Sequence, residues 1–282
     1  MRLALRGYRK MFGEALSAGM PTTLFVTRDI LAAAPVPLSP RNEFGMTNPF
    51  IRKLENVCQI SDEQRRELDR LTRVVRHLGP RDEFVEGDDG PHVVNIVLSG
   101  WAIRYRDLPD GRRQVIAILL PGDMCDPFGF LLRPVKCSFR SLTKITLAQI
   151  PVHKLRELAD GSPGLTDGLW WQSHEAGEIQ REKILSLGRR LAIERLAHFF
   201  CELFWRSEVT GHTEGSSCDM PITQENLGHV LGISTVQANR SLQELRERGL
   251  IRLADKRLTV IDSSMLAKLA MFDPTYLRRR AA

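Results

Sequence analysis

The side chains with the most specific chemistry lie between Pro221 and Asp262, where polar residues recur at the spacing of one helix face. The apolar residues Ala238, Leu242 and Leu245 predict a buried side, which leaves the opposite side free to meet a ligand. On such a side an arginine can donate two hydrogen bonds to guanine, amides can reach base edges, and an aliphatic side chain can contact a thymine methyl. We therefore predict a DNA-reading surface made of Ser234, Thr235, Val236, Gln237, Asn239, Arg240 and Gln243.

Two short helices joined by a tight turn must position these side chains. Thr223 is typical of a helix N-cap, Gly232 suits the turn, and Ser234 followed by Gln237 predicts a capping box for the second helix. Two helices connected in this way form a helix-turn-helix. The inner face of the first helix is predicted to be Leu227, Val230 and Leu231.

A basic hairpin follows the second helix. The residues 250–253 and 258–261 alternate as strands around the turn 254–257, and Lys256 and Arg257 place two cations at its tip. Cations at this position can neutralise DNA phosphates. A simpler interpretation is an amphipathic helix pair with a solvated polar face, but the caps, the glycine turn and the basic hairpin occur together and in order.

Residues 81–150 show a different, period-two pattern. Apolar residues mark short strands over 94–98, 101–105, 115–120 and 145–150, and Asp110-Gly111 between the second and third of these runs predicts a hairpin. We expect an antiparallel β-roll, followed by a long helix over 165–187 that carries Trp170, Gly177 and Ile184 at the seven-residue spacing of paired helices. Gly188 is predicted to end that helix and to form a hinge.

Composition limits the remaining classes. The 282 residues suggest about two domains, and a net charge of +6 permits a polyanionic partner. No apolar run is long enough to cross a bilayer, so no membrane partner is predicted, and five cysteines without a C-x-x-C pair favour a reducing cytoplasm. Residues 1–45 contain no secretory signal and are expected to be a mobile extension.

Over 48–262 the chain resembles the Crp/Fnr family of bacterial transcription regulators. The matching segments are Phe84-Val85-Glu86-Gly87-Asp88, Ile96-Val97-Leu98-Ser99-Gly100, Leu120-Pro121-Gly122-Asp123 and Ile233-Ser234-Thr235-Val236-Gln237-Ala238-Asn239-Arg240. The resemblance implies an α+β fold with a jelly-roll sensor domain, a long dimerisation helix and a C-terminal winged helix-turn-helix. The corresponding ranges are 1–45 for the extension, 46–163 for the effector domain, 164–187 for the dimerisation helix and 188–282 for the DNA-binding domain.

The same resemblance implies a homodimer that binds a pseudo-palindromic site on double-stranded DNA and contacts RNA polymerase. Arg240 falls on the family's base-contacting arginine, whereas Thr235 and Val236 stand where many members have charged residues. The target sequence therefore does not follow from the resemblance.

The signal to which the effector domain responds is left open between a small molecule and a redox change. Family members that bind cyclic AMP need a glutamate for the ribose and an arginine for the phosphate, and this chain lacks both. Cys58 is alone near the start of the effector domain, where an iron-sulfur cluster would need several cysteines. Cys125 and Cys137 could report redox state. The residues expected at the effector pocket are Asp126, Phe128, Lys136 and Cys137.

Two other classes of function compete with DNA binding. A cupin-like metalloenzyme would need a His-x-His motif, but His92 has no histidine two residues away, and no G-x-S-x-G nucleophile motif occurs. We therefore predict neither a catalytic residue nor a metal site. The winged helix could instead bind protein under control of a ligand-sensing roll, an alternative that predicts no salt-dependent affinity for DNA.

Overall fold

The computed structural model describes residues 48–86, 93–127 and 137–277, without the side chains of Val85, Glu86 and Cys137. The described residues belong to one compact unit. The extension predicted for 1–45 lies outside the described residues. The described part confirms the predicted α+β fold, because helices and antiparallel sheets occupy separate stretches of the chain.

Two short helices precede the roll, and both begin at a side chain that caps them. Asn48 accepts a hydrogen bond from the Phe50 amide at the start of α2 (Pro49–Glu55). Ser61 and Gln64 form a reciprocal capping box at the start of α3 (Asp62–Leu71). These helices pack their apolar residues on the roll, where Phe50, Leu54 and Leu68 are fully buried.

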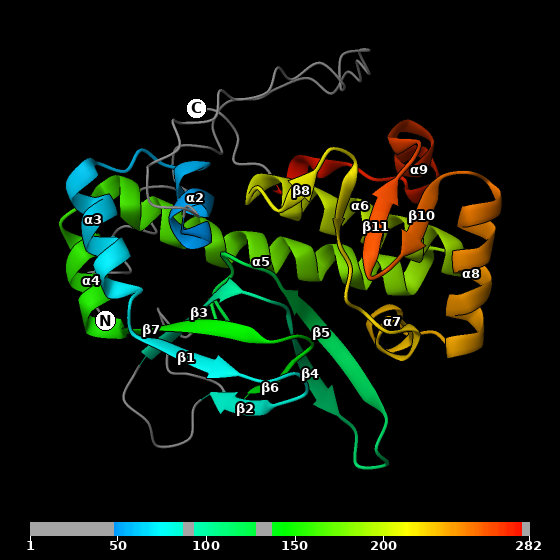
Figure 1. Ribbon diagram of the computed structural model, residues 1–282, viewed down its shortest axis with the longest axis horizontal. Helices are drawn as coiled ribbons and strands as arrows, with labels where there is room; N and C mark the ends of the chain where they lie inside the picture. The colour runs from blue at the N-terminus through cyan, green and yellow to red at the C-terminus, as the bar shows by residue number, and fades with distance from the viewer. Residues whose placement is uncertain (1–47, 87–92, 128–136, 278–282) are drawn as a thin grey trace, which may run out of the picture. The chain divides into compact units, whose positions relative to one another are not determined.

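The roll consists of two antiparallel sheets (Figure 1). One sheet has the order β1-β7-β3, with β1 (Val75–Leu78), β7 (Ile145–Pro151) and β3 (Val93–Ser99). The other has the order β2-β6-β4-β5, with β2 (Glu83–Glu86), β6 (Cys137–Ser141), β4 (Ala102–Asp107) and β5 (Arg113–Leu119). The core between them contains Val97, Ala102, Leu119, Phe139 and Leu147. The period-two alternation correctly predicted β3, β4, β5 and β7.

A β-bulge interrupts the pairing of β4 with β5. Arg104 pairs with Ala117, but the next residue, Tyr105, pairs with Val115, so Ile116 is the extra residue on β5. Bulges turn carbonyl groups and side chains out of the regular ladder. This bulge lies beside Arg104, a buried residue whose side chain faces the cavity described below.

A short helix, α4 (Val152–Asp160), leads into the long helix α5 (Pro163–Arg189), which crosses the centre of Figure 1 in green. The prediction that Gly188 ends this helix is wrong, because α5 continues to Arg189 and Arg190 is the extended residue that follows. Glycine inside a helix costs only about 1 kcal/mol and does not by itself end the helix. The Arg190 guanidinium fixes the end instead, since it donates to Glu182 at 3.0 Å and to the Ala270 carbonyl at 3.2 Å.

The C-terminal region begins with α6 (Ala192–Val209) and the strand pair β8 (Thr213–Glu214) and β9 (Ser217–Asp219). The helices α7 (Gln224–Leu231) and α8 (Thr235–Glu247) follow, and then the hairpin of β10 (Ile251–Ala254) and β11 (Arg257–Val260). Strand β11 also pairs with β9. The chain continues through α9 (Ser263–Ala270) and a 3-10 turn, η1 (Pro274–Leu277).

The C-terminal region and the roll share one hydrophobic core. Trp101, Tyr105 and Ile118 of the roll lie in the same buried cluster as Phe200 of α6 and Leu231 of α7. A direct polar contact adds to it, because Gln114 Nε2 of β5 donates to the carbonyl of His229 at 2.8 Å. The sequence pattern, read one segment at a time, gave no sign of this shared core.

Candidate nucleic-acid interface

The turn between α7 and α8 forms at the predicted residues with a side-chain cap at each helix, but among the described contacts Ser234 and Gln237 form only one of the two bonds of the predicted capping box. Thr223 Oγ1 accepts from the Asn226 amide and Ser234 Oγ accepts from the Gln237 amide, each at 3.2 Å. Gly232 has a φ of 64°, a left-handed conformation that glycine adopts without strain. The two helices also approach closely, because a Cβ atom at Gly228 would lie 2.9 Å from the Ile233 carbonyl oxygen.

Helix α8, orange in Figure 1, divides into a buried and an exposed side. Ala238, Leu242 and Leu245 are at most 1% exposed, as predicted. Val236 is 61% exposed although it is apolar. The remaining residues of the predicted DNA-reading surface are also exposed, namely Ser234, Thr235, Gln237, Asn239, Arg240 and Gln243. The structure thus leaves all of them accessible to a ligand.

Two cations of this region are free to meet a ligand. Within the described ranges, neither Arg240 nor Lys256 forms a hydrogen bond or an ion pair through its side chain. Asn239 Oδ1 accepts a long contact of 3.4 Å from Gln224 Nε2, and its amide nitrogen remains available. Exposed guanidinium and ammonium groups without an acidic partner favour the binding of anions.

Arg257, which was expected to contribute to the same surface, forms ion pairs with acidic side chains, and a second arginine, Arg190, is buried. Arg257 lies on β11, where it pairs with Glu214 at 2.9 Å and Asp219 at 3.7 Å, so the hairpin turn itself presents Lys256 alone. Arg190 is only 8% exposed and holds the end of α5. The acidic partners of Arg257, Glu214 and Asp219, are distant from it in the sequence, and the partner of Arg190, Glu182, lies about two helix turns before it. The basic residues near each arginine in the sequence therefore do not indicate these ion pairs.

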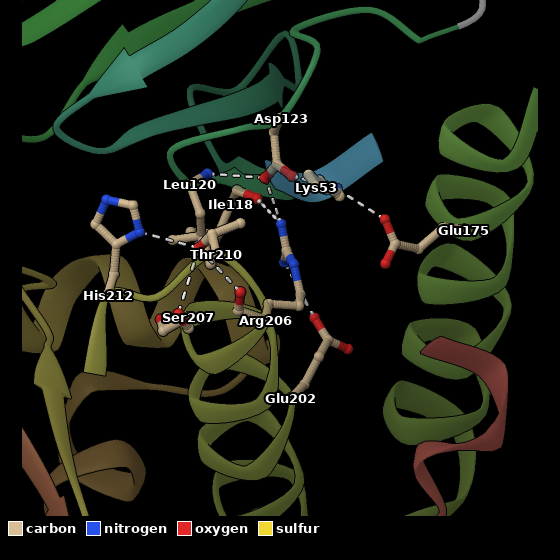
Figure 2. Close-up of polar contacts among 10 residues, drawn as sticks. All are labelled: Lys53, Ile118, Leu120, Asp123, Glu175, Glu202, Arg206, Ser207, Thr210 and His212. Atoms are coloured by element: carbon tan, nitrogen blue, oxygen red, sulfur yellow. Dashed lines mark hydrogen bonds and ion pairs between the residues drawn. The ribbon is translucent and has the colours of Figure 1, made fainter. Parts of the chain in front are cut away.

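A buried ionic cluster connects the roll, α5 and α6, and sequence reasoning missed it entirely. Its members are Lys53 of α2, Asp123 after β5, Glu175 of α5, and Glu202 and Arg206 of α6 (Figure 2). Lys53 Nζ lies 2.7 Å from both Asp123 Oδ1 and Glu175 Oε2, and Arg206 Nη2 lies 2.6 Å from Asp123 Oδ2. Each member is at most 9% exposed.

Backbone groups complete the coordination of this cluster. Asp123 Oδ2 accepts from the Leu120 amide at 2.8 Å, and Arg206 donates to the Ile118 carbonyl at 3.0 Å. Burial opposes ionisation of Asp123, but the charges of Lys53 and Arg206 outweigh it and lower the pKa of this carboxyl. Asp123 therefore stays charged at neutral pH, and its ion pairs with Lys53 and Arg206 tie segments of the chain together.

The residues expected at the effector pocket are only partly described. Asp126 is half-buried, Phe128 and Lys136 lie outside the described residues, and so does the side chain of Cys137. The cavity that the structure shows beside them is lined by Cys125 and Pro127, together with residues of α5 and α6. These effector-pocket positions remain a prediction.

The described cysteines differ in how far burial suppresses their reactivity. Burial raises the pKa of Cys201 to about 12 and that of Cys218 to about 11, so both thiols stay protonated at neutral pH. Among the residues that the structure places, no group of three or more His, Cys, Asp or Glu side chains is arranged to hold a metal ion. No helix in the described ranges is long and apolar enough to span a membrane.

Comparison with known proteins agrees with this arrangement. Residues 75–162 match the model of the cyclic nucleotide-binding domain, and residues 194–269 match that of the Crp-like helix-turn-helix domain. The nitrogen fixation regulation protein FixK of Rhizobium meliloti is 30% identical over 202 residues, which cover 65% of this chain and 87% of that protein.

FixK of Azorhizobium caulinodans is 29% identical over 208 residues, covering 71% of this chain and 83% of that protein. The structure of FixK2 from Bradyrhizobium japonicum has the same fold, with a TM-score of 0.59 and 23% identity over 74% of this chain and 98% of that one. An effector-type roll, a long helix and a winged helix-turn-helix thus occur here in the order found in those regulators. The chain belongs to the Crp/Fnr family and is a DNA-binding transcription factor, not an enzyme.

Proposed function

We propose that this transcription factor acts as a homodimer that binds a pseudo-palindromic DNA site through two copies of α8. The observation that carries the proposal is an apolar row on the outside of α5. Trp170 is 54% exposed, Ile184 is 70% exposed and Leu185 is 48% exposed, although all three are large and apolar. Exposed apolar residues that line one side of a long helix are typical of an interface.

The glycines on this side of α5 support a helix as the partner. Within 4 Å of a Cβ atom built at Gly177 or at Gly188 there is no other atom, so both positions face open space. Gly177 stands seven residues from Trp170 and from Ile184, which places it in the same row. A second α5 packed along this row would bury Trp170 and Ile184 and could approach closely at Gly177.

Within that dimer each exposed residue of α8 has a distinct role. Arg240 would read guanine with its two-pronged guanidinium, Asn239 and Gln243 would contact base edges, and Val236 would contact a thymine methyl. Ser234, Thr235 and Gln237 lie at the helix N-terminus, where backbone amides favour a phosphate. Lys256, and Arg257 insofar as its acidic partners release it, would contact phosphates of the backbone. Two such helices match half-sites about 34 Å apart.

Other aspects of the function rest on the family alone. We propose that the dimer works in the cytoplasm and contacts RNA polymerase, as the relatives' role in transcription suggests. The signal is a small molecule or a redox change. Arg and Glu residues that cyclic AMP would need are absent from the matching positions of the sequence, which favours a different effector.

Selection of duplexes from a random DNA pool tests the proposal. At fixed salt the wild-type protein should enrich a two-fold symmetric motif, and it should sediment as a dimer. Ile184→Glu should give a monomer that no longer selects both half-sites, because it places a charge in the apolar row. Val74→Glu is the matched control, since Val74 is 64% exposed but lies outside α5. A monomeric wild-type protein, or binding without an enriched motif, would contradict the proposal.

A further inference from the structure

The C-terminal end of α7 has carbonyl groups that its own helix does not satisfy. In a helix that ends at Leu231, the last four carbonyls have no partner within the helix. The Gly228 carbonyl accepts from the amide of Gly232, which follows the helix. Among the described residues, no backbone amide donates to the carbonyls of His229, Val230 and Leu231. These carbonyls therefore need donors from side chains elsewhere in the chain.

Two side chains supply those donors, and one of them belongs to the roll. Nε2 of Gln114, on β5, donates to the His229 carbonyl at 2.8 Å and lies 3.5 Å from the Val230 carbonyl. Nη1 of Arg195, on α6, donates to the Leu231 carbonyl at 3.1 Å. A strand of the roll and a helix of the C-terminal region therefore cap α7 together.

The amide of Gln114 has one orientation that fits its surroundings. Besides the His229 carbonyl, its Nε2 atom donates to the Val115 carbonyl at 3.0 Å. Because a carbonyl only accepts hydrogen bonds, the amide nitrogen and not the amide oxygen must face both groups. The two hydrogens of the amide are thus used, one within β5 and one toward α7.

Helix α5 holds the same part of β5 and also approaches the turn after α7. Nζ of Lys183 donates to the Val115 carbonyl and, at 3.2 Å, to the Ile116 carbonyl, where the bulge interrupts the ladder with β4. A Cβ atom at Gly232 would lie 2.9 Å from Cδ2 of Leu187, so α5 comes close to the turn itself. The end of α7 is thus fixed relative to α5, the helix proposed to form the dimer.

The end of α7 in turn determines where α8 begins. Only Gly232 and Ile233 separate α7 from Ser234, the N-cap of α8. The two helices are also in close contact, because a Cβ atom at Gly228 would lie 2.9 Å from the Ile233 carbonyl oxygen. A binding site needs its side chains held within roughly 0.5 Å and 10 to 20° of their productive geometry. The cap on α7 therefore bears directly on the orientation of α8.

This contact with the roll leaves the predicted DNA-reading surface open. Val236 is 61% exposed and Arg240 is exposed while Gln114 caps α7. A contact that inhibited DNA binding by covering α8 would bury those side chains. The arrangement therefore favours a contact that positions α8 over one that blocks it.

We propose that Gln114 is a positioning residue for DNA recognition, through which the roll and α5 fix the orientation of α8. Gln114 does not touch DNA and acts only by capping α7. The inference rests on the proposed function, because a fixed angle between α8 and α5 is what lets two copies of α8 meet half-sites about 34 Å apart. A shift of β5 would change the affinity for DNA by the same route.

Hydrogen exchange without DNA tests the cap. Gln114→Leu removes the donor and leaves the His229 carbonyl without one, so the amides of 228–235 should exchange about 5- to 30-fold faster. Gln149→Leu is the matched control, since Gln149 is also half-buried on a strand of the roll but its Nε2 atom donates to Asn95 at 3.2 Å. That control should leave the exchange of 228–235 unchanged. Wild-type exchange in Gln114→Leu would overturn the proposal.

The affinity for DNA tests the consequence. On the duplex that the wild type selects, Gln114→Leu should bind about 5- to 30-fold more weakly in fluorescence anisotropy, and Gln149→Leu should stay within about 2-fold of the wild type. Both variants should sediment as dimers. Unchanged affinity in Gln114→Leu would overturn this inference and leave the proposed function intact. Tighter binding would also overturn it, because the contact would then oppose DNA binding.

Half-site spacing gives a readout that a merely structural role of Gln114 would not change. The wild type should prefer the selected duplex over one with a single base pair inserted between the half-sites, and this preference should fall in Gln114→Leu because α8 is no longer fixed relative to α5. Arg240→Ala, which removes a base contact, should weaken both duplexes alike and keep the preference. An unchanged preference in Gln114→Leu would overturn the positioning role. A wild type that enriches no motif would instead defeat the proposed function, and this inference with it.

Discussion

The exposed face of α8 and the buried ionic cluster use the same residue types for opposite purposes. On α8 the cation Arg240 is exposed and has no partner among the described residues, so it is available for a polyanion. In the cluster Lys53 and Arg206 are at most 8% exposed and share Asp123. The exposed cation on α8 is therefore available to bind a ligand, whereas the buried cations of the cluster hold segments of the chain together through their ion pairs.

This difference predicts where a substitution will be felt. Removal of a buried charge leaves its partners desolvated, and the whole fold bears the cost. Removal of an exposed charge changes the affinity for DNA and leaves stability almost unchanged.

Asp123→Ala should have the largest effect. It leaves Lys53 and Arg206 buried without the carboxylate that they share, and we expect unfolding in urea to show a loss of about 3 to 5 kcal/mol. Asp110→Ala is the matched control, because Asp110 pairs with Arg112 at 2.8 Å on the exposed hairpin. That control should lose less than about 1 kcal/mol, and equal losses in the two variants would break the comparison.

Lys183 should make the stability of the interior depend on pH. Its folded pKa of about 8 lies below the value of 10.5 in the unfolded chain, so the unfolded chain binds more protons between these values. The free energy of unfolding of the wild type, relative to Lys183→Met, should rise by about 2 to 3 kcal/mol from pH 7.5 to pH 10. Urea unfolding of both proteins across this range measures it, and a flat difference would show that Lys183 is not held as a buried cation.

Arg240→Ala should weaken binding to the selected DNA site by about 1 to 3 kcal/mol and relax the preference at one base pair per half-site. Because the side chain is exposed, its free energy of unfolding should stay within about 0.5 kcal/mol of the wild type. Fluorescence anisotropy with cognate and single-mismatch duplexes separates the two outcomes. A uniform loss on every duplex would mean that Arg240 contacts only the phosphate backbone.

Lys256→Ala should have the smallest effect on DNA affinity, and this effect should not depend on the DNA sequence. A phosphate contact at the hairpin turn predicts weaker binding to every duplex alike, with the slope of log affinity against log salt concentration reduced by about 1. The same titration on Arg257→Ala should show a smaller change, since Arg257 is already paired with Glu214. If the arginine variant has the larger effect, that ion pair opens when DNA binds.

Local signals explain why much of the interface could be predicted. Thr223, Gly232 and Ser234 each act on the backbone within a few residues, and the structure shows the two caps and the left-handed turn. The buried side of α8 follows from helical periodicity in the same way. Small local elements without such a pattern, including β8, β9 and α9, were not predicted.

Long-range pairing explains where prediction failed. Arg257 was expected to face DNA, but it forms an ion pair with Glu214. Gly188 was expected to end α5, but the end of this helix is fixed by Arg190, which donates a hydrogen bond to the distant Ala270 carbonyl. The Lys53 and Asp123 pair spans 70 residues, and the Arg206 and Asp123 pair spans 83. No periodicity or spacing connects residues so far apart.

The sequence by itself determined the local geometry of this protein, namely the alternating strands, the capped helices and the polar face of α8, since caps, turns and periodicity act over a few residues. Only the tertiary structure decided which charged side chains are exposed without a partner and which form ion pairs within the protein. Whether a charge is paired depends on its burial and on partners that are distant in the sequence. The free-energy cost of a buried charge is set by its desolvation and by the ion pair that offsets it. Arg104 in the cavity, Arg206 in the cluster and Arg240 on α8 are the same amino acid in three such environments.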